Sequence, residues 1–129
     1  MPIADTSFVI DLMRQDPGAL FAYEAYEREG IALQTTAVTA LELYKGAFLS
    51  ESEQNRKKTE TLLELFTILP VDETVYEAFG RISAALARNG DAIGDFDELI
   101  AAIALGCDGE IITRDRHFSK VPNLKVISY

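Results

Sequence analysis

The sequence predicts an α/β protein, built as a three-layer α/β/α sandwich around a mostly parallel sheet of four to five strands. Short apolar runs with strand character alternate along the chain with longer segments of helical periodicity, an order typical of parallel sheets covered on both faces. No internal repeat, low-complexity segment or long linker interrupts the 129 residues. We therefore expect one domain that covers residues 1–129.

Five short runs of apolar and β-branched residues, each ending at polar or turn residues, are the predicted strands. They cover residues 1–4, 31–36, 67–71, 110–113 and 125–127. The first run stops abruptly at Asp5, and apolar residues at helical spacing follow at once. We therefore expect this strand to lead directly into a helix, with Asp5 at the carboxyl edge of the sheet.

Helices are predicted where a capping residue or a proline precedes apolar residues spaced by three and four positions. They cover residues 8–13, 17–28, 37–49, 72–88 and 96–105. A further helix, the fourth along the chain, starts at Ser50 or Ser52 and ends at residue 66. In the sixth helix, Asp95 and Glu98 are predicted to form a capping box. In the third helix, one arc of the helical wheel holds an apolar stripe that we expect to face the core: Val38, Leu41, Tyr44, Phe48 and Leu49.

The composition of the chain indicates its cellular compartment and the kinds of partner that its charge favours. The single cysteine, Cys107, excludes an internal disulfide and suits a reducing compartment, and neither a signal peptide nor a membrane span is evident, so the cytoplasm is the expected location. The net charge of −9, from 21 acidic and 12 basic residues, argues against broad electrostatic attraction to nucleic acid. A local basic patch or a bound metal ion can still reverse the sign of the charge at a site.

Four carboxylates are predicted to meet at one edge of the sheet. Asp5 and Asp115 lie just past strand ends, Asp97 opens a helix, and Glu42 lies at the edge of the apolar arc of the third helix. Each has a structural alternative: helix capping for Asp5 and Asp115, and a favourable interaction with the helix dipole for Asp97. Lys45, which projects into the same arc as Glu42, is either a snorkelling lysine or part of a polar cavity.

A cluster of carboxylates without a counter-charge raises the pKa of each of its members, and a hard divalent cation relieves this repulsion. Oxygen ligands favour Mg²⁺ or Mn²⁺ over Zn²⁺, and the sequence has no Cys/His cluster of the kind that binds zinc.

Four motifs along the chain carry a family resemblance. They are Asp5-Thr6-Ser7 with Ile10-Asp11-Leu12, Thr39-Ala40-Leu41-Glu42-Leu43, Ile93-Gly94 with Asp97 and Ile100-Ala101-Ala102, and Ile112-Thr113-Arg114-Asp115-Arg116-His117-Phe118. In this order and spacing the sequence resembles PIN-domain nucleases, especially the VapC-type toxins of prokaryotic toxin–antitoxin pairs. The resemblance covers essentially the whole chain, through the final Leu124-Lys125-Val126.

The resemblance implies an active site and a reaction. The acidic site of the family maps onto Asp5, Glu42, Asp97 and Asp115, which act as catalytic metal ligands, and the hydroxyls of Thr6, Ser7 and Thr113 match supporting positions. Members of the family hydrolyse RNA phosphodiester bonds with Mg²⁺ or Mn²⁺. They commonly form homodimers, and the toxins are neutralised by a small antitoxin protein.

Four cations are candidates for contacts to RNA phosphates: Lys45, Arg114, Arg116 and Lys120. The alternative for each is simple solvation, which is the common fate of an exposed cation. For His117, the only histidine, we expect a packing or hydrogen-bonding role rather than a catalytic one.

Three other functions compete with an endoribonuclease toxin. A PIN-like nuclease that processes RNA outside a toxin pair has the same site, and a catalytically silent module that binds RNA or protein is the main alternative without enzymatic activity. A phosphatase or dehalogenase with Asp5 as nucleophile is disfavoured, because such enzymes usually need a second acid two residues later, where Ser7 stands.

Overall fold

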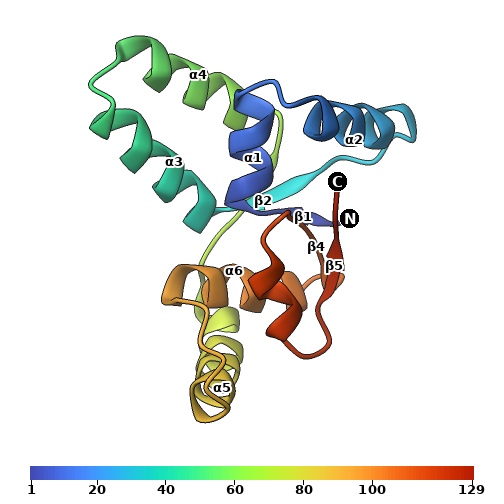
Figure 1. Cartoon of the computed structure of the whole chain (residues 1–129), viewed down its shortest axis with the longest axis vertical. Helices are drawn as coiled ribbons and strands as arrows, with labels where there is room; N and C mark the ends of the chain where they lie inside the picture. Colours follow the sequence, from blue (N-terminus) through green and yellow to red (C-terminus); the bar gives the residue numbers. More distant parts are fainter.

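A fully parallel, five-stranded sheet is the centre of the computed structural model, which describes residues 1–129 (Figure 1). Its strand order is β3-β2-β1-β4-β5. The strands are β1 (Ile3–Ala4), β2 (Gln34–Thr36), β3 (Thr67–Leu69), β4 (Glu110–Ile112) and β5 (Lys125–Ile127). The two central strands, β1 and β4, are in register with Ile3 opposite Ile111 and Ala4 opposite Ile112. The predicted α/β class and parallel sheet are confirmed.

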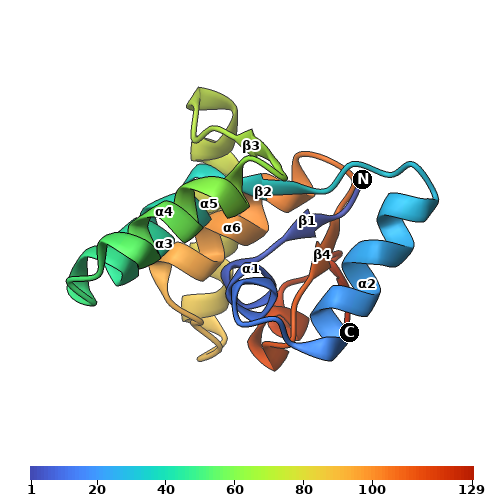
Figure 2. The same ribbon diagram turned by 90° about the horizontal axis from the view of Figure 1, so that it is seen from above.

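Helices cover both faces of this sheet. They are α1 (Thr6–Met13), α2 (Pro17–Arg28), α3 (Ala37–Leu49), α4 (Glu53–Leu63), α5 (Glu73–Arg88), α6 (Asp95–Leu105) and the 3-10 helix η1 (Arg116–Lys120). Figure 1 shows α1 to α4 on one side of the sheet and α5 and α6 on the other, and Figure 2, seen from above, shows β2, β1 and β4 side by side. None of the helices is long and apolar enough to cross a lipid bilayer.

Alternation along the central strands divides the core in two, because successive side chains of a strand point to opposite faces. Ile3 and Ile111 point into a cluster formed with α5, α6 and η1, which includes Phe118. Ala4 and Ile112 point into a second cluster formed with α1, α2 and α4. The strand β1 is therefore completely buried, as are Ile111 and Ile112 of β4.

The structure corrects the predicted packing of α3. Leu41 and Phe48 were expected to face the core, but their exposed fractions are 63% and 62%, and Leu49 is exposed as well. Val38 is buried as predicted, and the other buried residues of α3 are Thr39, Leu43 and Ala47. The helix packs through this face, where the small side chains of Thr39 and Ala47 permit close approach, so its bulky apolar arc lies on the surface.

The beginning of α6 also differs from the prediction. The helix starts at Asp95, one residue earlier than expected, and its N-cap is Gly94, which has a positive φ of 104° and no capping side chain. Asp95 is therefore not the cap. Glu98 does not complete the expected box either, because its carboxylate accepts a hydrogen bond at 3.0 Å from the backbone amide of Ile93, which precedes the cap.

Phe8 and Phe21 test the assignment of the core. Phe8, in α1, is completely buried, whereas Phe21, in α2, is 70% exposed. We expect Phe8→Ala to lower the free energy of unfolding by about 3–5 kcal/mol, because it opens a cavity in the packed interior. Phe21→Ala is the matched control, and we expect it to change stability by less than about 0.5 kcal/mol. Urea denaturation measures both values, and equal losses would contradict the assignment.

Candidate functional site

The strand order places a topological switch point at the carboxyl edge of the sheet. The chain runs from β1 outward to β2 and β3 on one side, and returns to β4 and β5 on the other. Such a switch point separates the loops that leave the neighbouring strands β1 and β4, and ligands of open parallel sheets bind there. Asp5 directly follows β1, and Thr113 and Asp115 follow β4. The sequence prediction that these groups share one edge is confirmed by the strand pairing.

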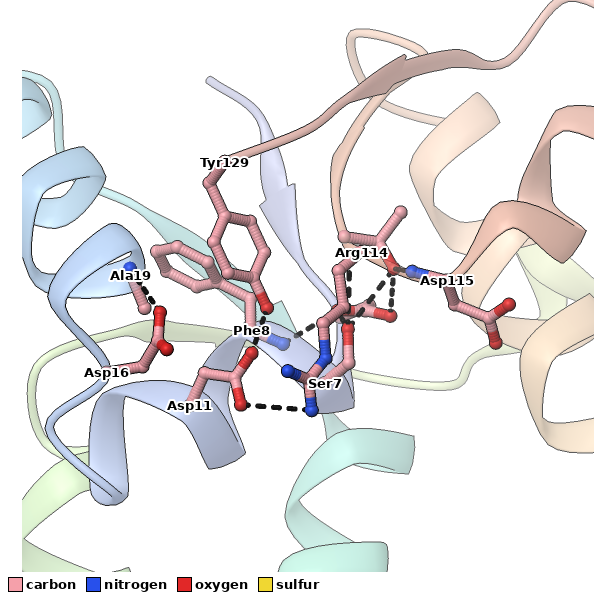
Figure 3. Close-up of polar contacts among 10 residues, drawn as sticks. Ser7, Phe8, Asp11, Asp16, Ala19, Arg114, Asp115 and Tyr129 are labelled. Atoms are coloured by element: carbon pink, nitrogen blue, oxygen red, sulfur yellow. Dashed lines mark hydrogen bonds and ion pairs between the residues drawn. The ribbon is translucent and has the colours of Figure 1, made fainter.

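Only 3% of the surface of Asp5 is exposed, and three donors hold its carboxylate, two of which, Ser7 and Phe8, are labelled in Figure 3. The Ser7 hydroxyl donates to Oδ1 at 2.7 Å, and the Phe8 amide donates to the same oxygen at 2.9 Å. The Thr113 hydroxyl donates to Oδ2 at 2.6 Å. Asp5 thus caps α1, as the structural alternative predicted, and also joins α1 to the loop after β4. Burial raises the pKa of Asp5 even though these hydrogen bonds stabilise its charge.

Glu42 reaches the site from α3 through threonine hydroxyls. The Thr6 hydroxyl donates to Glu42 Oε1 at 2.8 Å and lies 3.1 Å from the Thr39 hydroxyl oxygen. Since Thr6 is the first residue of α1 and neighbours Asp5, this contact fixes Glu42 relative to the end of β1. The expected supporting positions of Thr6, Ser7 and Thr113 are all occupied by hydroxyls that contact an acidic residue of the site.

Asp115 is tied to the same network from the other side. Its backbone amide donates to the Thr113 hydroxyl oxygen at 2.9 Å, so Thr113 connects Asp5 with Asp115. Its carboxylate caps η1 by accepting the His117 amide at 2.9 Å, and the same oxygen lies 2.7 Å from His117 Nδ1. The hydrogen-bonding role expected for His117 is therefore present, and its imidazole is exposed.

Asp97 faces the other three carboxylates from the first turn of α6. Its pKa is raised to about 6, first because partial burial removes water from the carboxylate and then because Asp115, Glu42 and Asp5 add negative charge. No hydrogen bond stabilises the ionised form, and His117 lowers this pKa only in part. The electrostatic influence of three acids on one side chain places all four carboxylates in one neighbourhood.

The donors of this neighbourhood fit a hard divalent cation. All are carboxylate oxygens, and the Asp97 carboxylate accepts no hydrogen bond that a cation would have to replace. Yet no three acidic, histidine or cysteine side chains lie close enough in this structure to form a complete ion site.

The four basic residues predicted to contact RNA differ in whether they make an ion pair. Lys45, Arg116 and Lys120 are exposed and make no ion pair, whereas Arg114 Nη2 lies 3.2 Å from Asp11 Oδ1. Sequence reasoning gave Asp11 no role of its own. The signal that could have found it is a charged residue within the buried stripe of α1, beside Phe8 and Leu12.

Comparisons with known proteins agree with the fold and with the family that the sequence resembles. The profile of the PIN domain family matches residues 3–124. The chain is 32% identical over 124 residues to Ribonuclease VapC2 of Haemophilus influenzae, covering 94% of this chain and 92% of that protein.

Solved structures give the same assignment. The fold is similar to that in a DNA-bound VapBC structure from Salmonella typhimurium, with a TM-score of 0.84, 26% identity and coverage of 99% and 98% of the two chains. It is also similar to VapBC-5 from Mycobacterium tuberculosis, a member of the VapBC family of toxin-antitoxin systems, with a TM-score of 0.69, 27% identity and coverage of 98% and 95%.

The raised pKa of Asp97 predicts a pH-dependent gain in stability from Asp97→Asn. In the unfolded chain Asp97 has its ordinary pKa of 3.8, whereas in the folded protein its pKa is about 6. Because the folded state binds more protons between these values, the ionisation of Asp97 lowers stability as the pH rises through them. In EDTA, Asp97→Asn should therefore raise the melting temperature at pH 7.5, and the difference should shrink toward pH 4.

Asp95→Asn is the control for this measurement, because it removes a carboxylate from the same helical turn at an exposed position. We expect it to leave stability unchanged or slightly lower at both pH values, since it weakens a favourable interaction with the helix dipole. A gain from Asp97→Asn that is the same at both pH values, or is matched by Asp95→Asn, would show that Asp97 is not under electrostatic strain.

Proposed function

This chain belongs to the PIN-domain family, and from that premise we propose that its acidic site hydrolyses phosphodiester bonds of RNA, as the endoribonuclease toxin of a toxin–antitoxin pair. One observation carries the proposal: at the switch point of the sheet, the Thr113 hydroxyl joins Asp5 to Asp115, and the Thr6 hydroxyl joins Glu42 to the start of α1. The names of the similar proteins, a VapC ribonuclease and a VapBC toxin-antitoxin system, support both the reaction and the pairing.

In this proposal Asp5, Glu42, Asp97 and Asp115 bind Mg²⁺ or Mn²⁺. When bound, the cation polarises the phosphoryl group and stabilises charge on the leaving oxygen. The hydroxyls of Ser7 and Thr113 keep the Asp5 carboxylate in one orientation, and Thr6 does so for Glu42. No side chain of the site is a nucleophile, and the carboxylates orient the attacking water.

Basic residues near the acidic site provide local positive charge for RNA on a protein whose net charge is negative. Arg114, Arg116 and Lys120 flank Asp115 in sequence, and Lys45 lies one helical turn after Glu42. We propose that these side chains contact the phosphates on either side of the scissile bond, while the net charge of −9 limits non-specific binding elsewhere.

Two surfaces are candidates for protein partners. A groove between α1, α3 and α4 is lined by apolar and basic side chains and has Glu42 in its wall. We propose that a small antitoxin protein occupies it and so blocks access to the acidic site.

We assign the exposed apolar face of α3, with Leu41 and Phe48, to contact with a second copy of the chain. Cleavage of cellular RNA is consistent with the proposed location of the protein in the cytoplasm.

The alternatives share the fold but differ in behaviour. A silent binding module needs none of the four acids, and all four are present with their supporting hydroxyls. An RNA-processing nuclease outside a toxin pair has the same chemistry but needs no antitoxin. Co-purification of a small protein from the native host distinguishes a toxin from a processing enzyme.

RNA cleavage by the purified protein tests the proposed reaction. We expect cleavage of a panel of structured cellular RNAs in Mg²⁺ or Mn²⁺ and none in EDTA. Asp97→Asn should lower the cleavage rate by at least about 100-fold, because it removes one of the charges that hold the cation. Asp95→Asn, in the same turn of α6, should keep the wild-type rate. Full activity of Asp97→Asn, or cleavage in EDTA, would refute the assignment of the site.

The oligomeric state tests the role of α3. We expect sedimentation velocity to give a dimer for the wild-type protein and a monomer for Leu41→Glu, because the substitution buries like charges across a symmetric interface. Leu65→Glu, at an exposed leucine outside α3, should remain dimeric. A monomeric wild-type protein, or a Leu41→Glu variant that dimerises as well as the wild type, would exclude this interface.

A further inference from the structure

Asp11 is a buried carboxylate that the proposed reaction does not use. It lies on the inner face of α1 beside Phe8, Val9 and Leu12, and only 2% of its surface is exposed. A buried carboxylate is strongly unfavourable unless charged or hydrogen-bonding partners compensate for its lost hydration. Its partners therefore indicate what it does.

Two side chains compensate Asp11, and each binds a different oxygen. Arg114 Nη2 lies 3.2 Å from Oδ1, and the Tyr129 hydroxyl donates to Oδ2 at 2.5 Å. The Tyr129 ring packs edge-on against Phe8, with ring centres 4.9 Å apart, so the hydroxyl is held rigidly in place. Burial and the nearby carboxylate of Asp11 raise the pKa of Tyr129, which keeps its hydroxyl protonated as a donor.

Arg114 connects this buried group with the acidic site. Its backbone amide donates to the Ser7 hydroxyl oxygen at 3.4 Å, and Ser7 in turn donates to Asp5. Ser7 and Asp11 are four residues apart and lie on the same face of α1. The Arg114 side chain therefore runs along this face, from the acidic site to Asp11 (Figure 3).

The guanidinium keeps most of its donors available. Its side chain is 57% exposed, and Asp11 is its only ion-pair partner. Arginine has five N–H donors in a rigid, planar group, so one edge can bind Asp11 while another binds a phosphate. An arginine without such an anchor would sample many rotamers and would lose that entropy on binding.

We propose that Asp11, itself fixed by Tyr129, is a positioning residue that orients Arg114 to bind a phosphate of the RNA strand beside the acidic site. This inference rests on the proposed ribonuclease function. It gives the buried carboxylate a task in substrate binding rather than in the chemical step. It also separates Arg114 from the other three basic candidates, which have no such anchor.

Steady-state kinetics on a labelled RNA that the wild-type protein cleaves tests the proposal. Arg114→Gln and Asp11→Asn should each raise KM by about five- to tenfold and leave kcat within about twofold, because a charged hydrogen bond to substrate is lost or misplaced. In EDTA, binding of the same RNA should show a salt dependence weaker by about one phosphate contact in both variants. Asp16→Asn, which removes the helix-capping carboxylate of α2, is the control and should change neither quantity.

A double-mutant cycle separates positioning from a purely structural role. If Asp11 acts through Arg114, Asp11→Asn should have no further effect on KM in the Arg114→Gln background. Tyr129→Phe keeps the ion pair but removes the hydroxyl, so it should raise KM by a smaller factor, and it provides a second variant if Asp11→Asn does not fold.

Three results would overturn the proposal. The first is an unchanged KM for Asp11→Asn despite a lower melting temperature, and the second is an additive effect on KM in the double variant. The third applies if Asp11→Asn does not fold, and it is a wild-type KM for Tyr129→Phe. A wild-type protein that cleaves no RNA would instead refute the proposed function itself.

Discussion

The burial of the Asp5 carboxylate at the end of β1 is the constraint on which the rest of the site depends. Its oxygens are held by donors from two segments that are far apart in sequence, the start of α1 and the loop after β4. The same Thr113 hydroxyl accepts the amide of Asp115, so one threonine sets the spacing of two acids. The parallel pairing of β1 with β4 makes this possible, because it brings both strand ends to one edge.

Hydrogen bonding is distributed unequally over the four acids, and this inequality gives the site its electrostatic character. Asp5, Glu42 and Asp115 each accept at least one hydrogen bond, whereas Asp97 accepts none and takes up the repulsion of the other three. Its raised pKa is the consequence. A site built in this way sacrifices stability in the absence of a counter-charge, and a divalent cation is the partner that restores the balance.

The general rules of parallel sheets accounted for most of the fold and for the four acids. Asp5 and Asp115 could be placed at one edge because both follow strands, and Asp97 and Glu42 because of their places in the predicted helices. The family resemblance then assigned all four a role in metal binding. Three features of the structure could not be predicted from the sequence in this way. Apolarity alone does not say which face of α3 is covered, so Leu41 was placed inside although it is exposed. The cap of α6 depends on the positive φ of Gly94, and Asp11 depends on Arg114 and Tyr129, which lie more than 100 positions away in sequence.

Anomalous diffraction from crystals grown with Mn²⁺ would show whether Asp5, Glu42, Asp97 and Asp115 share a divalent cation at the switch point of the sheet. We expect an anomalous peak among these carboxylates, with Asp97 moved toward the other three. A fully occupied Mn²⁺ elsewhere on the protein, with these four side chains unchanged and no peak between them, would contradict this expectation.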